Sequence, residues 1–303
     1  MIVVVCPGQG SQTPGFLAPW LELDGAADRL AAFSDAAQVD LVAHGTESGA
    51  EVIRDTRIAQ PLIVAASILA WERLTQGGQR PAGVAGHSVG EIAALVAAGV
   101  TDAEAGMRLV GVRGRAMADA AAVTETGMSA VVGGDEQQVL DAIAANGLTA
   151  ANYNGGGQIV AAGELSALAA LAEQAPRGAR VIPLQVAGAF HTPFMAPAQE
   201  ALRAAVAEVA GVSDPALPLW TNSDGGTVDG GARALELIVH QVANPVRWDL
   251  CMASFAEHGV TGIIELAPAG ALVGLAKRGL RGVPSVAVKT PDDLAPALEL
   301  LAA

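Results

Sequence analysis

The segment Gly86-His87-Ser88-Val89-Gly90 decides the fold, because it places a serine between two glycines where an apolar stretch meets a helix-forming one. Residues 82–85 before it are small or apolar, and residues 91–98 after it favour a helix that Gly99 would end. In this setting the pattern Gly-x-Ser-x-Gly predicts a strand, a sharp turn and a helix, a nucleophile elbow. The glycines allow a strained turn that exposes the serine hydroxyl near the positive end of the helix.

The chain on either side of this segment alternates between strand and helix patterns. The apolar run at residues 2–6 predicts a first buried strand, followed by a glycine-rich loop and helical sequence up to about residue 75. The later patterns predict helices over 91–98, 102–121 and 197–209, and strands over 217–222 and 262–266. This alternation indicates an α/β domain.

A run of short elements between residues 126 and 189 interrupts that pattern. It predicts strands over 128–132, 149–153, 158–162 and 180–186, with helices over 136–145 and 165–174. The order βαββαβ is the ferredoxin-like unit, and Asn154-Gly155-Gly156-Gly157 is typical of a hairpin turn within it. We therefore expect an α/β-hydrolase-like large domain, formed by residues 1–125 and 190–303, with an inserted ferredoxin-like small domain at residues 126–189.

The composition excludes several classes of protein. Hydrophobic residues make up 51% of the 303 residues, yet no uninterrupted apolar run reaches the ~20 residues of a membrane span. The N-terminal run has no basic region or cleavage site typical of a signal peptide, so we expect a cytoplasmic protein. The net charge of −14 argues against binding to nucleic acid or to a membrane surface.

Metal and cofactor chemistry finds little support in the sequence. Cys6 and Cys251 form neither a metal motif nor a disulfide framework. The five histidines, at positions 44, 87, 191, 240 and 258, lack the spacing of a helical zinc pair. Gly8-Gln9-Gly10 follows the first strand, but Thr13 stands where a dinucleotide fingerprint needs Gly or Ala. We expect no metal and no cofactor.

A serine nucleophile needs a base, usually a histidine, to remove its proton. His87 adjoins Ser88, but neighbouring residues on an elbow point in different directions. His191 lies where the inserted domain rejoins the large one, and clefts between domains are favoured ligand sites. His191 is therefore the candidate base, and a junction histidine with purely structural contacts is the alternative.

Two further features suit a site at Ser88. The backbone amides of the loop at Gln9 could supply one N–H of an oxyanion hole, with Val89 supplying the other. Arg113 lies on the apolar side of a predicted helix, where an arginine is costly unless an anion pairs with it. In a cleft it would hold a substrate carboxylate through two parallel hydrogen bonds. The pattern alone leaves a solvated arginine as the alternative.

The motifs that occur in order are Pro7–Gln12, the elbow through Glu91, Arg113 with Met117, Gly188–His191 and Gln241–Trp248. Together they resemble the malonyl-CoA:acyl carrier protein transacylase family over essentially the whole chain, and also the acyltransferase domains of modular polyketide synthases. The resemblance implies a ping-pong transfer for fatty-acid or polyketide synthesis. Ser88 would take the malonyl group from malonyl-CoA as an ester and pass it to the phosphopantetheine thiol of acyl carrier protein, with His191 as base and then acid.

The resemblance also implies roles for other residues: backbone amides of Gln9 and Val89 in the oxyanion hole, Arg113 on the malonyl carboxylate, Met117 and Asn154 at the substrate, and the Gln241 carbonyl as the group that orients His191. In related domains a phenylalanine before the histidine accompanies malonyl rather than its α-methyl analogue. Phe190 therefore favours malonyl, because its ring would fill the space that the methyl group needs.

Two alternatives belong to other classes of protein. A serine hydrolase such as a thioesterase would share the serine, the base and the oxyanion hole, but the acids between Ser88 and His191 lie in no suggestive loop. A non-catalytic docking subunit would not need Ser88, His191 and Arg113 intact.

We expect a monomer with malonyl-CoA and acyl carrier protein as partners. Because carrier proteins are acidic, a chain of net charge −14 needs a local basic patch to dock one. The candidate cations for this patch are Arg177, Arg180, Lys277, Arg278 and Arg281.

Overall fold

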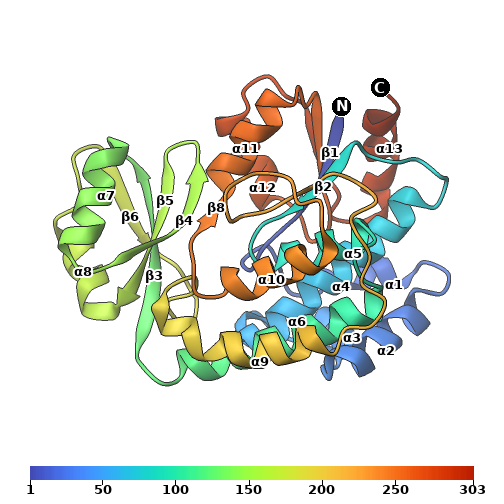
Figure 1. Cartoon of the computed structure of the whole chain (residues 1–303), viewed down its shortest axis with the longest axis horizontal. Coiled ribbons are helices and arrows are strands. Elements are labelled where there is room, and N and C mark those ends of the chain that lie inside the picture. The colour runs from blue at the N-terminus through green and yellow to red at the C-terminus, as the bar shows by residue number, and fades with distance from the viewer.

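The computed structural model describes residues 1–303 and divides their strands between two five-stranded sheets. Figure 1 shows the two bodies side by side, with the small domain on the left and both chain termini at the top of the large domain. The α/β architecture with an inserted smaller domain is confirmed.

The first sheet is parallel and has the strand order β10-β9-β1-β2-β7. Its strands are β1 (Ile2–Cys6), β2 (Gly83–Gly86), β7 (Leu219–Trp220), β9 (Gly262–Glu265) and β10 (Ser285–Ala287). Helices cover both of its faces, so the central strand β1 is buried at every residue, which is why it is a continuous apolar run. The carboxyl ends of β1 and β2 lead into the Gln9 loop and the elbow, which places both at one edge of the sheet.

The predicted strand over 217–222 is shorter than expected. Only Leu219–Trp220 pairs with β2, because the chain turns back at Thr221, whose N–H donates to the Gly226 carbonyl and whose carbonyl accepts from the Gly225 N–H.

The helices of the large domain surround this sheet. They are α1 (Ala18–Leu21), α2 (Ala26–Ala37), α3 (Leu41–Thr46), α4 (Thr56–Thr75), α5 (Gly90–Ala97), α6 (Ala103–Ala121), α9 (Ala196–Ala207), α10 (Gly231–Gln241), α11 (Trp248–Glu257), α12 (Ala271–Gly279) and α13 (Leu294–Ala302). Single 3-10 turns span Val52–Arg54, Pro193–Met195 and Pro291–Asp293. The helices predicted over 91–98, 102–121 and 197–209 correspond to α5, α6 and α9, and each end agrees to within two residues. None of the helices combines the length and the apolar character needed to cross a bilayer.

The small domain has the ferredoxin-like order predicted from the sequence. Its elements are β3 (Thr126–Gly133), α7 (Glu136–Ala145), β4 (Thr149–Gly155), β5 (Gln158–Glu164), α8 (Leu165–Glu173) and β6 (Ala179–Pro183). The four strands pair antiparallel in the order β6-β3-β5-β4. Gly156 and Gly157 form the turn of the β4–β5 hairpin, with φ values of 56° and 76°. A tight two-residue hairpin turn needs positive φ at both central positions, which glycine adopts without strain. β6 ends at Pro183, three residues earlier than predicted.

A strand of the large domain completes the second sheet. β8 (Val246–Arg247) pairs parallel with β4, and Gly155 at the end of β4 lies against α11, where a Cβ atom would come within 2.5 Å of Met252 Cε. The β4–β5 hairpin is thereby held against the large domain from two sides. The limits 126–189 for the inserted domain stay a prediction, and the second sheet extends beyond them through β8.

The elbow glycines are required by contact. A Cβ atom on Gly86 would lie 2.1 Å from the Gly90 carbonyl carbon, and one on Gly90 would lie 2.2 Å from the Cys6 carbonyl oxygen. Both neighbours are backbone atoms of the central sheet or of the elbow itself, so neither can rotate away. The turn between β2 and α5 is therefore as tight as the sequence pattern predicts.

We expect Gly90→Ala to lower the free energy of unfolding by about 1–3 kcal/mol or more, because the added methyl group overpacks against backbone. Gly274→Ala is the matched control: it lies within α12, and a Cβ atom there would meet nothing within 4 Å. It should raise stability by roughly 0.5–1 kcal/mol, the advantage of alanine over glycine in a helix. Chemical denaturation of both variants measures the difference, and equal midpoints would contradict the packing argument.

Candidate active site

The structure brings Ser88 and His191 into direct contact. Ser88 Oγ lies 2.7 Å from His191 Nε2, and His191 Nδ1 lies 2.8 Å from the backbone carbonyl oxygen of Gln241. A carbonyl can only accept, so Nδ1 carries the ring proton and Nε2 is free to accept the proton of the serine hydroxyl. No carboxylate bonds to this histidine. The three groups form a row in which Ser88 is poised to lose its proton to His191.

Burial keeps the histidine neutral. The pKa of His191 is lowered from 6.5 to about 3, first by burial, then by the nearby Arg113 cation and to a smaller extent by His87, and only the bond to the Gln241 carbonyl acts in the opposite direction. A neutral imidazole with a free Nε2 is the form that a general base needs.

Arg113 lies beneath the serine and is almost completely buried, at 1% exposure. Its Nη1 donates to Gln60 Oε1 at 2.8 Å and its Nη2 to Gln241 Oε1 at 2.9 Å, while the same Nη2 lies 3.4 Å from Ser88 Oγ. Burial lowers its pKa to about 10, with Glu91 opposing, so it stays charged at neutral pH. The alternative of a solvated arginine is therefore excluded, and a buried cation lies next to the serine hydroxyl.

An open cavity of about 530 Å³ lies over Ser88 between the two domains. Its walls come from the elbow, the Gln9 loop, the small-domain sheet and the segment before His191: Gln9, His87, Ser88, Met128, Asn152, Asn154, Val160, Leu184, Val186, Phe190 and His191. Phe190 and Asn154 stand in the cavity wall, as expected of substrate contacts. Met117 does not: it is buried beneath the guanidinium, where its sulfur accepts from Gln60 Nε2 at 3.6 Å.

The Asn154 side chain is already occupied by protein groups. Its Oδ1 lies 2.9 Å from His87 Nε2 and its Nδ2 donates to Gln158 Oε1 at 3.0 Å. The His87 ring packs edge-on to Trp248, with 5.7 Å between the ring centroids. The hairpin of the small domain is thereby tied to the residue next to Ser88, which explains why His87 takes no part in the row of Ser88, His191 and Gln241.

The backbone amides of the elbow and of the Gln9 loop differ in whether the protein uses them. The Ser88 N–H donates to Asn222 Oδ1 at 2.8 Å, and the Gly90 N–H donates to the His87 carbonyl at 2.9 Å. Neither the Val89 N–H nor the Gln9 N–H has a protein acceptor. Both amides predicted for the oxyanion hole are thus without a protein acceptor, as that role requires.

Sequence reasoning missed the polar side chains that support this arrangement: Gln60, Glu91 and Asn222, each at most 4% exposed. Glu91 accepts from the Asn222 N–H at 2.6 Å and from Gln241 Nε2, and burial raises its pKa to about 7. A signal existed for two of them, because Gln60 and Glu91 are isolated polar residues inside apolar helices. Asn222 carries no such signal.

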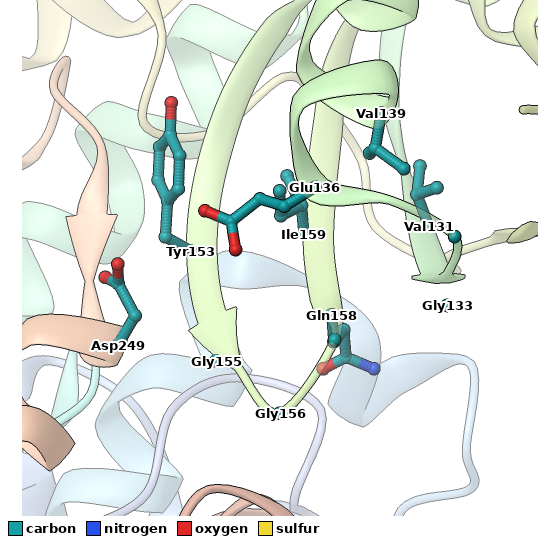
Figure 2. A pocket seen from close by; sticks show the side chains of 12 residues that line it. Val131, Gly133, Glu136, Val139, Tyr153, Gly155, Gly156, Gln158, Ile159 and Asp249 are labelled. Carbon is teal, nitrogen blue, oxygen red and sulfur yellow. The ribbon is translucent and has the colours of Figure 1, made fainter.

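A second cavity, of about 430 Å³, lies on the other side of the β4–β5 hairpin. Figure 2 shows Tyr153, Glu136 and Asp249 around it, with the Glu136 carboxylate directed toward Tyr153. Arg247 stacks over the Tyr153 ring at 4.5 Å and pairs with Asp249 at 2.7 Å. The carboxylates of Glu136 and Asp249 in this second cavity would repel an anionic substrate, so we assign the chemistry to the cavity over Ser88.

The five candidate docking cations, Arg177, Arg180, Lys277, Arg278 and Arg281, are all exposed and form no ion pair. Arg278 lies against Gly156 in the β4–β5 turn. Asn154, two residues before Gly156, lines the cavity over Ser88. Arg180 belongs to β6, and the chain beyond β6 reaches the same cavity through Leu184 and Val186. Arg278 therefore places an unpaired positive charge beside the hairpin that borders the cavity, and Arg180 places one on the strand whose continuation lines it.

Comparison with known proteins supplies a family for this geometry. The model of the acyl transferase domain family matches residues 3–296. The malonyl CoA-acyl carrier protein transacylase of Mycobacterium tuberculosis is 54% identical over 297 residues, which cover 97% of this chain and 98% of that protein.

Solved structures of malonyl transacylases have the same fold as this chain. The crystal structure of the M. tuberculosis enzyme superposes with a TM-score of 0.95 at 53% identity and covers 98% of this chain and 99% of that one. A malonyl-transacylase in complex with its type II polyketide synthase acyl carrier protein superposes with a TM-score of 0.92 at 32% identity, covering 99% of both chains.

We expect the reactivity of Ser88 to persist from about pH 8 down to about pH 5, because His191 is protonated only near pH 3 in the folded protein.

The folded protein should also lose stability over part of this pH range. An unfolded histidine binds its proton near pH 6.5, so the contribution of His191 is complete above that value and falls as the pH drops toward 3. The rate of labelling by a fluorophosphonate measures the first effect and thermal unfolding the second. A loss of labelling centred near pH 6.5 would contradict the buried neutral base.

Proposed function

The chain belongs to the acyl transferase domain family, and from this premise we propose that Ser88 carries a malonyl group from malonyl-CoA to the phosphopantetheine thiol of an acyl carrier protein. The observation that carries the proposal is the row from Ser88 through His191 to the Gln241 carbonyl, with the buried Arg113 cation beside it. The product supplies fatty-acid synthesis, and polyketide synthesis uses the same chemistry.

The first half-reaction acylates the serine. His191 Nε2 removes the proton of Ser88 Oγ as Oγ attacks the thioester carbonyl carbon. The carbonyl oxygen becomes an oxyanion, which the N–H groups of Val89 and Gln9 stabilise. When the intermediate collapses, the carbon–sulfur bond breaks, the coenzyme A thiolate takes the proton from His191, and a malonyl-serine ester remains.

The second half-reaction runs the same steps with a different thiol. His191 Nε2 removes the proton of the phosphopantetheine thiol as its sulfur attacks the ester carbonyl. The same two amides hold the oxyanion, the bond between carbon and Ser88 Oγ breaks, and Oγ regains its proton from His191. The exposed, unpaired cations, Arg278 next to the β4–β5 hairpin and Arg180 on β6, would attract the acidic carrier despite the net charge of −14.

Arg113 provides the basis for selecting malonyl. An acyl group on Ser88 Oγ would bring its free carboxylate next to Arg113 Nη2, which lies 3.4 Å from Oγ. A buried guanidinium pairs strongly with a carboxylate because little water competes for either group. Phe190 in the cavity wall would limit the space for an α-methyl substituent, a preference worth ~1–3 kcal/mol for one methyl group.

The alternatives are not favoured. In a serine hydrolase of the triad type an acid orients the histidine, whereas a backbone carbonyl holds His191 here. A docking subunit would have no use for a serine and a histidine 2.7 Å apart. We further propose a cytoplasmic location, where the free, buried thiols of Cys6 and Cys251 suit a reducing compartment.

We expect the protein to gain one malonyl adduct when it is incubated with malonyl-CoA and no acceptor, and intact mass measures it. Ser88→Ala should abolish the adduct, and Ser223→Ala, an exposed serine outside the cavity, should retain it. A holo acyl carrier protein added next should remove the adduct and become malonylated. Turnover to free malonate without an adduct would instead indicate a hydrolase.

We expect Arg113→Ala to lower malonyl transfer by about 100-fold or more relative to acetyl transfer, because hydrogen bonds to a charged group contribute ~1.5–3 kcal/mol each. The ratio of the two rates removes any general effect of losing a buried side chain. Arg115→Ala, two residues along α6 with its guanidinium on the Ala37 carbonyl, is the matched control and should leave the ratio unchanged. Equal losses for both acyl groups would show that Arg113 does not bind the carboxylate.

A further inference from the structure

Asn222 is a fully buried side chain that joins the two sides of the elbow. Its Nδ2 donates to the Gly86 carbonyl at 2.7 Å and its Oδ1 accepts from the Ser88 N–H at 2.8 Å. The carboxamide therefore spans the turn around His87 and bonds to the backbone on both sides of it.

These two hydrogen bonds lie just beyond the last paired residues of β2 and β7. The pairing of β2 with β7 ends at Ala85 and Trp220, two residues before Asn222. Beyond that point Ser88 has a φ of +52°, a left-handed conformation that costs a non-glycine residue ~1–3 kcal/mol and persists only where the surroundings fix it. The Asn222 carboxamide continues the hydrogen bonding past the end of the ladder and stabilises the strained serine.

Asn222 is itself fixed in place and connected to the base. Its backbone N–H donates to Glu91 Oε1 at 2.6 Å, and its Oδ1 also accepts from Gln241 Nε2 at 3.1 Å. Gln241 is the residue whose carbonyl holds His191. One side chain thus contacts both the backbone of the nucleophile and the residue that orients the base.

We propose that Asn222 is a positioning residue for the reaction at Ser88. It fixes the elbow so that Oγ meets His191 Nε2, and by occupying the Ser88 N–H it leaves the Val89 N–H as the elbow amide available to an oxyanion. The position needs an acceptor facing Ser88 and a donor facing Gly86, which a carboxamide supplies and an ionised carboxylate does not. The substrate in this inference rests on the proposed function, whereas the geometry does not.

The direct test is Asn222→Asp, which keeps the shape and the acceptor but loses the donor to Gly86. We expect kcat for malonyl transfer to fall about 100-fold, the usual cost of a small misplacement of reacting groups, with KM changed by less than about 3-fold. Labelling of Ser88 by a fluorophosphonate should slow to the same extent. In that reaction Oγ bonds to phosphorus, fluoride leaves and His191 takes the proton, so the test needs no malonyl-CoA.

The pH dependence separates positioning from a general structural role. The introduced carboxyl group would face Glu91 and Cys251, with Arg113 beyond Gln241. At low pH it is protonated and its O–H can donate to Gly86 again, so the labelling rate of Asn222→Asp relative to wild type should rise as the pH falls. Asn222→Ala cannot regain the donor, and its relative rate should stay low at every pH.

Asn146→Asp is the matched control, because Asn146 Nδ2 donates to the Ala142 carbonyl at the end of α7, away from the site. It should leave labelling unchanged. The proposal would be overturned if Ser88 in Asn222→Asp were labelled at the wild-type rate, or if its relative labelling rate did not change with pH. It would also be overturned if neither Asn222 variant showed a cooperative thermal unfolding transition. If wild type took no malonyl group but the labelling results held, the proposed function would fail and the positioning role would stand.

Discussion

Gln241 is the residue on which the rest of the site depends, because serine, histidine and arginine all meet it. It is the last residue of α10, where helix carbonyls lack partners within the helix. Its carbonyl accepts from His191 Nδ1 at 2.8 Å and from the Asn244 N–H at 3.2 Å. The C-terminal end of a helix carries partial negative charge, which favours the imidazolium that forms during transfer. A helix end thus replaces the buried aspartate of a catalytic triad.

The side chain of the same residue sets the charges around the base. Gln241 Oε1 accepts from Arg113 and Gln241 Nε2 donates to Glu91, so a neutral amide separates a buried cation from a buried carboxylate. Arg113 lowers the pKa of His191 while the Gln241 carbonyl opposes it. Under the proposed function one cation has two effects. It adds to the effect of burial in keeping the resting base neutral, and it offers the malonyl carboxylate a partner next to the reacting oxygen.

Local patterns in the sequence predicted most of the fold and the contact between Ser88 and His191. The elbow and the βαββαβ order follow from glycine positions and from hydrophobic periodicity, and Ser88 and His191 follow from the elbow and from the junction of the domains. The sequence could not predict that β8 joins the small-domain sheet, because a two-residue strand has no periodicity of its own. Nor could it predict the bonds of Asn222 to the elbow or of Asn154 to His87, since each joins side chains far apart in the chain.

A malonyl group esterified to Ser88 would fit between the two free amides and the Arg113 guanidinium. A crystal structure of the protein after exposure to malonyl-CoA tests it most directly. We expect an ester on Ser88 Oγ whose carbonyl oxygen accepts from the Val89 and Gln9 N–H groups and whose carboxylate is bidentate on Arg113. An ester whose carboxylate points into solvent, with Arg113 still bonded only to Gln60 and Gln241, would contradict it.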